Sequence, residues 1–393
     1  MGFIMKVGVL AIASHDSGGI HQYTLSLLEA LKLINKDNIE FVQIRNQDFP
    51  KILTNDIVIN KKKSTIFLKF KRALHGILNV KIGNLTKDLD NESLLEISKI
   101  DLLISPVITL IPHHFGKPYI VTLHDFQQEY YPEFFTFKER MTRKIVYRTG
   151  KYAKFVVVES LYVKRDVIRF LKISDLKIKV IPSPPPFYLR EITITAERLL
   201  SIKMKYDLVD RYLFYPAQFW YHKNHLKLIE AIHLLREKYH IIIPLILVGS
   251  KKNNFGDVMK KIKELGLVEQ VKYLGYVPDE DMPYLYKLAT ALVMPTLFES
   301  VSLPIWEAFY LGCPVVSSNV CALPEQVGDA GLLFNPYNVN DMAEKIYKIL
   351  TDEGLRKDLI QRGYERVKDL TLENYANQWE KVIEEALNRA DRL

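Results

Sequence analysis

The stretch KVIPSPPPFYLRE, residues 179–191, divides the 393-residue chain into two similar halves. Residues 182–186 of this stretch contain four prolines. Proline fixes φ and lacks a backbone N–H, so this run cannot continue a helix or a central strand. We interpret the stretch as a linker between two domains, a number that the length of the chain also favours.

Both halves alternate short β-branched runs with amphipathic segments, which predicts α/β domains with mostly parallel, doubly wound sheets. The expected strands are residues 6–14, 40–45, 101–106, 119–125 and 154–160 before the linker, and 212–218, 241–250, 271–277, 290–296 and 314–319 after it. Expected helices include 226–239, 257–265 and 279–288. We place the two domains at residues 1–188 and 189–371, and a final helix at 372–393 that crosses back to the first domain.

Composition restricts the location and the partners of the protein. Apolar runs stay well short of the roughly 18 residues that span a bilayer, and two cysteines provide neither a disulfide framework nor a metal quartet, so a cytoplasmic location is expected. Residues 1–190 hold 29 Lys and Arg against 18 Asp and Glu, a net +11, whereas the remainder carries −3. The first half therefore favours either a polyanionic or membrane-surface partner, or simply a basic solvated face.

Residues 61–81, KKKSTIFLKFKRALHGILNVK, combine cations with apolar residues at helical spacing. The segment predicts either an amphipathic helix that lies on an anionic membrane or a core-packed helix with solvated lysines. Residues 137–154 add seven more cations. Nucleic acid is not an expected partner, because no recognised binding motif accompanies the charge.

The stretch FESVSLPIWE, residues 298–307, predicts a strand-to-helix junction. Ser302 is the expected N-cap, and Pro304 lies in the first turn, where its missing N–H costs nothing. Glu299 then precedes the helix and Glu307 lies about one turn inside it. The backbone amides of Val301, Ser302 and Leu303 are expected to lack intrahelical partners and to lie at the positive end of the helix dipole. Such amides suit an anionic or polyhydroxylated ligand.

This junction resembles the E-G-F-G-L-P-x-x-E element of the retaining family 4 glycosyltransferases (glycosyl transferases group 1), which have the two-domain GT-B fold. The resemblance continues through EAFYLGCPVVSSNVCALPEQVGDAGLLFNP, residues 307–336, and covers nearly the whole chain. It implies two Rossmann-like domains facing a central cleft. It also implies that Glu299 contacts hydroxyls of the donor sugar and that Glu307 holds the nucleotide ribose. Ser300 and Ser302 stand where the family usually has glycines.

Two further elements resemble the family's diphosphate site. In FYPAQFWYHKNH, residues 214–225, Lys223 matches the lysine that stabilises the leaving diphosphate, while Gln218 stands where most relatives carry an arginine. Gly18 and Gly19, which open a helix after the first strand, match a GG loop whose backbone faces the diphosphate. The arginine that is absent at Gln218 would be the second cation of the family's diphosphate site. Either the neutral Gln218 side chain, as a hydrogen-bond donor, or another group would then take its place.

The remaining site residues follow from the same resemblance. His124 lies in the stretch IVTLHD, residues 120–125. It matches a histidine of the family that lies beside the reacting sugar carbons. Ser250, Tyr276 and Val277 match segments whose backbone contacts the nucleobase, so the sequence does not distinguish uridine, guanosine and adenosine donors.

The resemblance as a whole implies a retaining, metal-independent hexosyltransferase without a cofactor, such as a mannosyl-, glucosyl- or rhamnosyltransferase. Its donor would be a nucleotide sugar and its acceptor a glycan or lipid-linked saccharide in cell-surface polysaccharide or glycolipid synthesis, on the cytoplasmic side of the membrane. Two alternatives stay open: a nucleotide-sugar epimerase on the same fold, and a non-catalytic nucleotide-binding relative.

Overall fold

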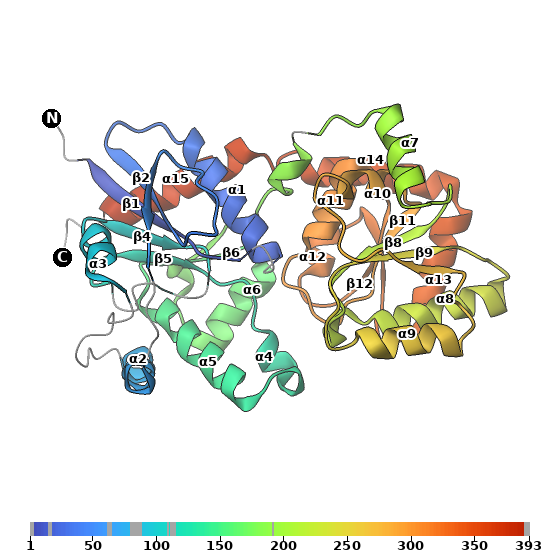
Figure 1. Cartoon of the computed structure of the whole chain (residues 1–393), viewed down its shortest axis with the longest axis horizontal. Helices are drawn as coiled ribbons and strands as arrows, with labels where there is room; N and C mark the ends of the chain where they lie inside the picture. Colours follow the sequence, from blue (N-terminus) through green and yellow to red (C-terminus); the bar gives the residue numbers. More distant parts are fainter. Residues whose placement is uncertain are drawn as a thin grey trace. The chain divides into compact units, whose positions relative to one another are not determined.

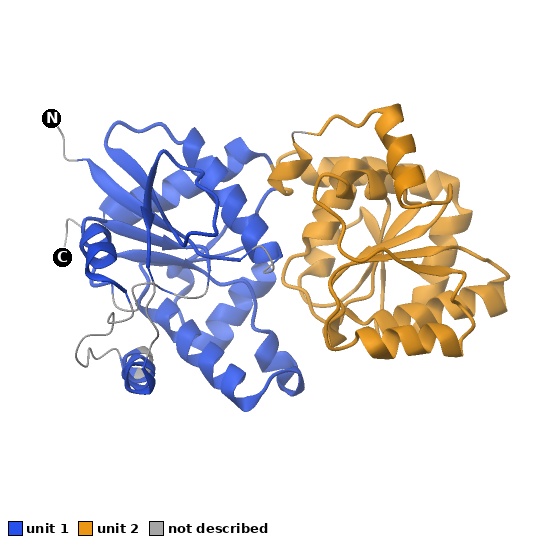
Figure 2. Ribbon diagram, in the orientation of Figure 1, with its two compact units in different colours: residues 1–184, 371–393 blue, residues 185–370 orange. Residues whose placement is uncertain are grey.

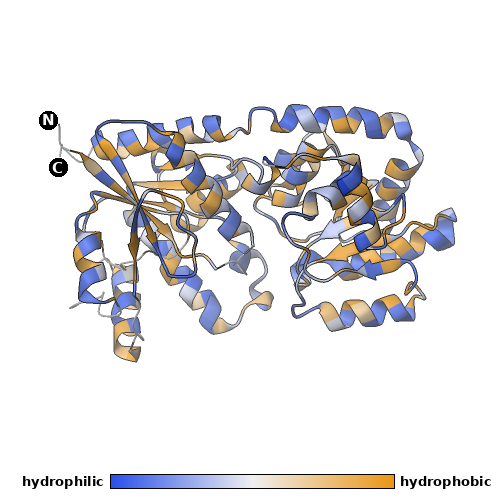
Figure 3. Ribbon diagram, turned by 45° about the horizontal axis from the view of Figure 1, so that its top comes forward, coloured by the Kyte–Doolittle hydropathy of each residue, from blue (hydrophilic) through white to orange (hydrophobic). Residues whose placement is uncertain are grey.

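The computed structural model describes residues 4–14, 18–60, 65–78, 89–107, 110, 115–190 and 192–388. The chain divides into two compact units (Figure 2). Unit 1 comprises residues 1–184 and 371–393, and unit 2 comprises residues 185–370. Each unit encloses its own hydrophobic core, with apolar strands in the interior and two-faced helices around them (Figure 3).

Unit 1 is built on a parallel sheet whose described strands number seven, in the order β3-β2-β1-β4-β5-β6-β7 (Figure 1). Because β1 pairs with β2 on one side and with β4 on the other, the direction of winding reverses between β1 and β4. The strands are β1 Met5–Ala11, β2 Ile39–Arg45, β3 Asn55–Val58, β4 Leu102–Ser105, β5 Tyr119–Thr122, β6 Phe155–Val158 and β7 Ile178–Val180.

The helices of unit 1 cover both faces of this sheet. Side-chain caps define several of them: Asp90 caps α3, and Thr136 forms a capping box with Glu139 at the start of α5. The helices are α1 Gly19–Leu33, α2 Ile66–Leu78, α3 Asn91–Ser98, α4 Gln127–Tyr130, α5 Phe137–Tyr147, α6 Leu161–Asp166 and α15 Leu372–Asn388.

The C-terminal helix α15 belongs to unit 1, as the sequence predicts. It packs along α1, and the fully buried Trp379 enters the same core as the strands β1 and β4. Its outer side is held by Lys36, whose Nζ lies 2.8 Å from an oxygen of Glu380 and 3.0 Å from one of Glu384. The end of the chain therefore completes the core of the unit that begins it.

Unit 2 repeats the plan with a parallel sheet of six strands in its described part, in the order β10-β9-β8-β11-β12-β13. The strands are β8 Leu213–Pro216, β9 Leu245–Val248, β10 Val271–Tyr273, β11 Ala291–Met294, β12 Val315–Ser318 and β13 Gly331–Phe334. The helices are α7 Ala196–Lys205, α8 His225–Tyr239, α9 Phe255–Glu264, α10 Met282–Leu288, α11 Leu303–Leu311, α12 Leu323–Val327, α13 Val339–Thr351 and α14 Glu353–Val367. The predicted α/β, doubly wound architecture is confirmed.

The structure corrects the sequence prediction at three strands, β3, β7 and β13, which the sequence missed. β7 lies partly inside the stretch interpreted as a linker, because Lys179 and Val180 pair with β6. The N–H of Ile181 still bonds the carbonyl of Val158 at 2.8 Å, so irregular structure begins only after it. The prolines that follow then end the strand.

Candidate functional site

The winding of unit 2 reverses between β8 and β11, since β8 pairs with β9 on its other side. In open parallel sheets, ligands bind beyond the carboxyl ends of the strands at such a switch point. The loop after β8 carries Lys223, in the 3-10 turn Tyr221–Lys223, and the loop after β11 carries Glu299. Two of the residues singled out in the sequence therefore follow the two strands that flank the switch point.

Lys223 and Glu299 form an ion pair, in which Lys223 Nζ donates to Glu299 Oε2. Both side chains are largely buried, so solvent screens this pair less than a surface pair. The two loops are also joined by their backbones, because the N–H of Leu297 donates to the carbonyl of His222 at 2.7 Å. The pair therefore places one cation and one carboxylate beyond the carboxyl ends of β8 and β11, on the side of the sheet where ligands of open parallel sheets bind.

Asn224 fixes the geometry of these loops, a role that sequence reasoning missed. Its backbone has a left-handed conformation with φ of 58°, which asparagine tolerates better than most residues. Its buried side-chain amide donates to the carbonyl of Pro295 at 2.9 Å and to that of Pro336 at 3.0 Å. Asn224 thus ties the loop after β8 to the loops after β11 and β13, and its place directly after Lys223 was the signal that could have found it.

Glu307 lies inside α11 and is buried. The phenol of Tyr286 on α10 donates to its carboxylate, and Tyr188 also hydrogen-bonds it. Burial raises the pKa of Glu307 to about 7 from its ordinary 4.5, while the two tyrosines oppose this rise. A carboxyl group with two phenol partners is well suited to exchange them for the hydroxyl groups of a ligand.

The N-terminus of α11 agrees with the predicted bounds, with Ser302 at the N-cap position and Pro304 in the first turn. Two details differ from expectation. The Ser302 side chain makes no capping hydrogen bond and finds no partner among the described residues, although it is buried. The Ser302 N–H, in turn, donates to Gln326 Oε1 at 2.8 Å, so this amide is already occupied. Of the three amides considered, Val301 and Leu303 remain the candidates for direct ligand contact.

The loops after β8, β9 and β10 meet beside Gln218. Gln218 Oε1 accepts a hydrogen bond from Trp220 Nε1 at 3.0 Å, and the N–H of Phe219 donates to the carbonyl of Ser250 at 3.1 Å. Gly249 has φ of 138°, and a Cβ there would lie 2.4 Å from the carbonyl oxygen of Ala217. This close approach requires glycine.

The other residues expected near a nucleobase follow β10. The N–H of Gly249 donates to the carbonyl of Gly275 at 2.9 Å, which joins the ends of β9 and β10. Tyr276 is exposed, whereas Val277 is buried in the core. Tyr276 and the backbone of Ser250 are therefore the accessible groups of this set.

In unit 1, His124 follows β5 and is held at both ring nitrogens. Nε2 lies 2.9 Å from the carbonyl oxygen of Pro106, which can only accept, and Nδ1 lies 2.9 Å from Glu159 Oε2. Burial lowers the pKa of His124, but Glu159, the carbonyl of Pro106 and the charge of Asp125 together raise it more, so the net change in pKa is upward. The arrangement favours an imidazolium that donates from both nitrogens.

Glu159, at the end of β6, is a site residue that sequence reasoning missed. Its second carboxylate oxygen accepts from Ser183 Oγ at 2.5 Å, in the proline-rich stretch. Tyr23 of α1 lies edge-on to the His124 ring, with centroids 4.8 Å apart. The signal that could have found Glu159 was its place after the apolar run of a buried strand, whereas His124 is found through the resemblance of its motif to the family.

Gly18 and Gly19 stand at the start of α1. Gly18 has a positive φ of 57°, which favours glycine, and Gly19 is the first residue of the helix. Residues 15–17, the rest of the loop that precedes them, lie outside the described residues. The amides of the first helical turn point toward the carboxyl edge of the sheet, as a phosphate-binding helix start requires.

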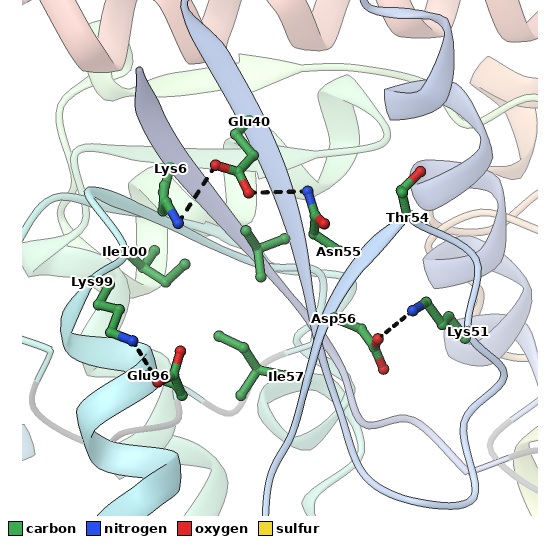
Figure 4. A pocket seen from close by; sticks show the side chains of 11 residues that line it. Lys6, Glu40, Lys51, Thr54, Asn55, Asp56, Ile57, Glu96, Lys99 and Ile100 are labelled. Atoms are coloured by element: carbon green, nitrogen blue, oxygen red, sulfur yellow. Dashed lines mark hydrogen bonds and ion pairs between the residues drawn. The ribbon is translucent and has the colours of Figure 1, made fainter. Parts of the chain in front are cut away.

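A cavity of about 310 Å³ lies at the opposite, amino edge of the unit 1 sheet (Figure 4). Its charged side chains neutralise one another: Lys6 lies 3.5 Å from Glu40, and Lys51 lies 2.7 Å from Asp56. Because none of the residues expected to bind a donor lines it, we do not consider it part of the candidate site.

Across the described ranges, no three His, Cys, Asp or Glu side chains come together in a group that could hold a metal ion. The same ranges contain no helix long and apolar enough to cross a bilayer.

Comparison with known proteins identifies the family. A family model described as glycosyl transferases group 1 matches residues 203–366. The O-antigen chain mannosyltransferase B of Escherichia coli is 32% identical over 274 residues, covering 68% of this chain and 70% of that protein. The E. coli serotype-specific mannosyltransferase WbdA is 29% identical over 225 residues, which cover 57% of this chain but only 27% of WbdA.

Among solved structures, Anabaena HepE, determined in complex with UDP and glucose, superposes with a TM-score of 0.74 at 17% identity. The match covers 97% of this chain and 100% of HepE, and it shows that the fold is the two-domain GT-B fold. Together with the identity to the mannosyltransferase, these matches settle the classification. The chain belongs to the glycosyl transferases group 1 family and is a glycosyltransferase of the GT-B fold.

Proposed function

We propose that the protein is a retaining hexosyltransferase of family 4 that moves mannose from a nucleotide sugar to a glycan or lipid-linked saccharide during cell-surface polysaccharide synthesis. The observation that carries the proposal is the Lys223–Glu299 pair at the switch point of unit 2, with Glu307 on the helix that follows. The choice of mannose rests on the relatives, which are named as mannosyltransferases.

In this proposal Lys223 binds the diphosphate of the donor and stabilises the charge that develops on it as the glycosyl bond breaks. Glu299 then accepts hydrogen bonds from the hydroxyls of the sugar, and Glu307 accepts them from the ribose. A donor therefore separates the Lys223–Glu299 pair and supplies each partner with a replacement. The amides after Gly18 and at Gly19 add donors to the phosphates.

Gln218 takes the place of the second cation of the diphosphate site and acts as an uncharged hydrogen-bond donor. Since its Oε1 accepts from Trp220, its Nε2 remains the group that can donate to a phosphate oxygen. Tyr276 and the backbone of Ser250 line the base, and the amides of Val301 and Leu303 face the sugar and phosphates. Val277, which is buried, and Ser302, whose N–H donates to Gln326, support these segments from behind.

His124 lies beside the reacting carbons in this proposal and acts as a doubly protonated group held by Glu159. The reaction needs no metal or cofactor, because Lys223 and the backbone amides supply the stabilising charge. Departure and attack on the same face of the sugar would retain the anomeric configuration without a protein nucleophile.

The proposal is tested by incubating the protein with GDP-mannose, UDP-glucose or UDP-galactose, each with and without a mannoside acceptor. We expect an acceptor-dependent mannoside from GDP-mannose, with the α configuration retained in its NMR spectrum. A product with inverted configuration would contradict retention. Epimerised donor in the absence of acceptor would instead support an epimerase.

Nucleotide binding gives a second measurement that does not depend on the acceptor. Thermal shifts with GDP, UDP and ADP identify the nucleotide, because a ligand that binds only the folded protein raises its melting temperature. The absence of a shift with all three would favour the non-catalytic alternative.

A further inference from the structure

Four apolar side chains of α2 point away from the protein. Ile66, Phe67, Phe70 and Leu78 are 87%, 65%, 59% and 59% exposed. A core-packed helix would bury these residues, and the sequence left that possibility open. The structure excludes it for this side of α2.

The opposite side of the helix is the one that anchors it. Leu68 and His75 are buried, and α2 lies against α5 and the following turn, Arg148–Tyr152 (Figure 1). At about 100° per residue, the four exposed apolar residues span an arc of roughly 120°, and Leu68 and His75 lie outside it. The apolar arc is therefore an outward face of a helix that is docked by its other side.

Cations border this face. On the helical wheel Lys71 lies about 20° beyond one edge of the arc and Lys69 about 60° beyond the other. Lys71 Nζ stands 4.4 Å from the centroid of the Phe67 ring. The neighbouring α5 has the same character. Its first residue, Phe137, is 77% exposed, and the exposed cations of this helix are Lys138, Arg140 and Lys144.

We propose that the outward face of α2, with the exposed cations of α5, docks on the surface of an anionic lipid bilayer. Apolar and aromatic side chains enter the interface between headgroups and acyl chains, while the flanking lysines bind lipid phosphates. Long cationic side chains at the edge of an apolar face suit this geometry, because their stems lie on the apolar surface and their charges reach the headgroups.

Charge complementarity decides between a bilayer and a second copy of the chain. A symmetric dimer through this face would place the lysines of one copy against those of the other, in a half of the chain that carries a net +11. An anionic surface turns the same charges into an attraction. Docking of this kind is independent of the donor site and would hold the enzyme where a lipid-linked acceptor lies.

The proposal is tested by sedimentation of the full-length protein with vesicles of phosphatidylcholine that contain about a third phosphatidylglycerol. We expect binding at low salt, at least tenfold weaker binding to pure phosphatidylcholine, and weakening at high salt. The double variant Phe67→Ser/Phe70→Ser should lose at least tenfold in affinity. Lys69→Glu/Lys71→Glu should lose a similar amount and much of the salt dependence.

The matched control is Leu200→Ser/Met204→Ser on α7 of unit 2, where the two side chains are 59% and 73% exposed and also lie near lysines. This control should bind vesicles as the unaltered protein does. All variants should keep the thermal shift with nucleotide, which separates loss of docking from loss of the fold or of the donor site.

Three results would overturn the proposal. They are the absence of binding to anionic vesicles at low salt, equal loss of binding in the α7 control, and unchanged binding in both α2 variants. A concentration-dependent dimer that Phe67→Ser/Phe70→Ser abolishes would assign the face to a second copy instead.

Discussion

At the scale of single residues, His124 and Glu159 form a charged pair whose state depends on pH. The raised pKa of His124 means that the folded protein binds this proton more tightly than the unfolded chain. The resulting stabilisation is fully present below the ordinary histidine pKa of about 6.5 and is lost as pH rises through the higher pKa of the folded protein. The pair therefore stabilises unit 1 most in mildly acidic solution.

We expect Glu159→Gln to lower the pKa of His124, because burial then acts without the opposing carboxylate. Transfer should fall about tenfold or more, on the scale of a positioned proton-transfer or hydrogen-bonding group. The high-pH limb of the rate profile should move to lower pH. Ser183→Ala is the control, because it removes a hydrogen bond to Glu159 and leaves the charge. An unshifted limb in Glu159→Gln would disprove the coupling.

Glu307 gives a pH linkage of the same sign as His124, because its pKa is also raised in the folded protein. The folded protein holds its proton between about pH 4.5 and 7 while the unfolded chain releases it, so stability decreases as pH rises across this range. A shift of this size corresponds to a loss on the order of 3 kcal/mol.

We expect Glu307→Gln to flatten that dependence in thermal unfolding measured from pH 4.5 to 8. It should also weaken binding of the nucleoside diphosphate at pH 8, where the ionised carboxylate would accept from the ribose. The control Glu344→Gln changes an exposed glutamate of the same unit and should alter neither quantity. Unchanged nucleotide affinity in Glu307→Gln would remove this residue from the ribose site.

At the scale of elements, the loops after β8 and β11 each contribute one partner of the Lys223–Glu299 pair. We expect Lys223→Ala to abolish transfer and weaken nucleoside diphosphate binding. Glu299→Ala should abolish transfer yet keep or tighten that binding, because it releases Lys223 for the phosphates. Isothermal titration with GDP and UDP measures the difference.

The control for this pair is Lys227→Ala, since Lys227 pairs with Glu230 on the exposed side of α8. It should leave transfer and binding unchanged. If Lys223→Ala and Glu299→Ala weakened nucleotide binding equally, the separate roles given to them would be wrong.

The turn after β9 depends on Gly249. Gly249→Ala places a methyl group against the carbonyl of Ala217 at a backbone conformation that alanine disfavours, so we expect a loss of roughly 1–3 kcal/mol or more and weaker nucleotide binding. Gly256→Ala on α9 is the matched control, because nothing lies within 4 Å of its added Cβ. That control should be neutral or slightly stabilising, by up to about 1 kcal/mol. Equal melting temperatures for the two variants would refute the argument.

Elements also show how far the sequence predicts the fold. Central strands such as FVVV, residues 155–158, are buried on both faces and therefore appear as unbroken apolar runs. The three missed strands, β3, β7 and β13, all lie at sheet edges, where partial exposure removes that signal. Local pattern therefore misses three of the four described edge strands, and it finds the fourth, β10, within the predicted run 271–277.

The residues of the candidate site likewise include some that the sequence predicts and some that it does not. Lys223, Glu299 and His124 stand out in the sequence because their motifs resemble those of the family. The structure places Lys223 and Glu299 after strands of the unit 2 sheet and His124 after a strand of the unit 1 sheet. Their partners are set by loops that are far apart in sequence: Lys223 pairs with a residue 76 positions away, and Tyr188 reaches Glu307 from the proline-rich stretch. Those contacts follow from packing and not from local pattern.

At the scale of the whole molecule, α15 is the element on which the stability of unit 1 depends most visibly. We expect Trp379→Ala to cost about 3–5 kcal/mol, because it empties a large fully buried volume in that core. Hydrogen exchange should show lost protection in unit 1 and retained protection in unit 2. Leu200→Ala, at an exposed position of unit 2, should change neither unit. Loss of protection spread equally over both units would contradict this assignment.

Residues 185–370 form unit 2 as one continuous segment, whereas unit 1 is built from two segments of chain that lie on either side of it in the sequence. Unit 1 starts the chain but receives Tyr375 and Trp379 only from its last helix. During synthesis the N-terminal sheet therefore cannot bury its α15 contact surface until the residues that follow unit 2 have been made. Translation from the N-terminus thus places the closure of the unit 1 core after the synthesis of the whole of unit 2.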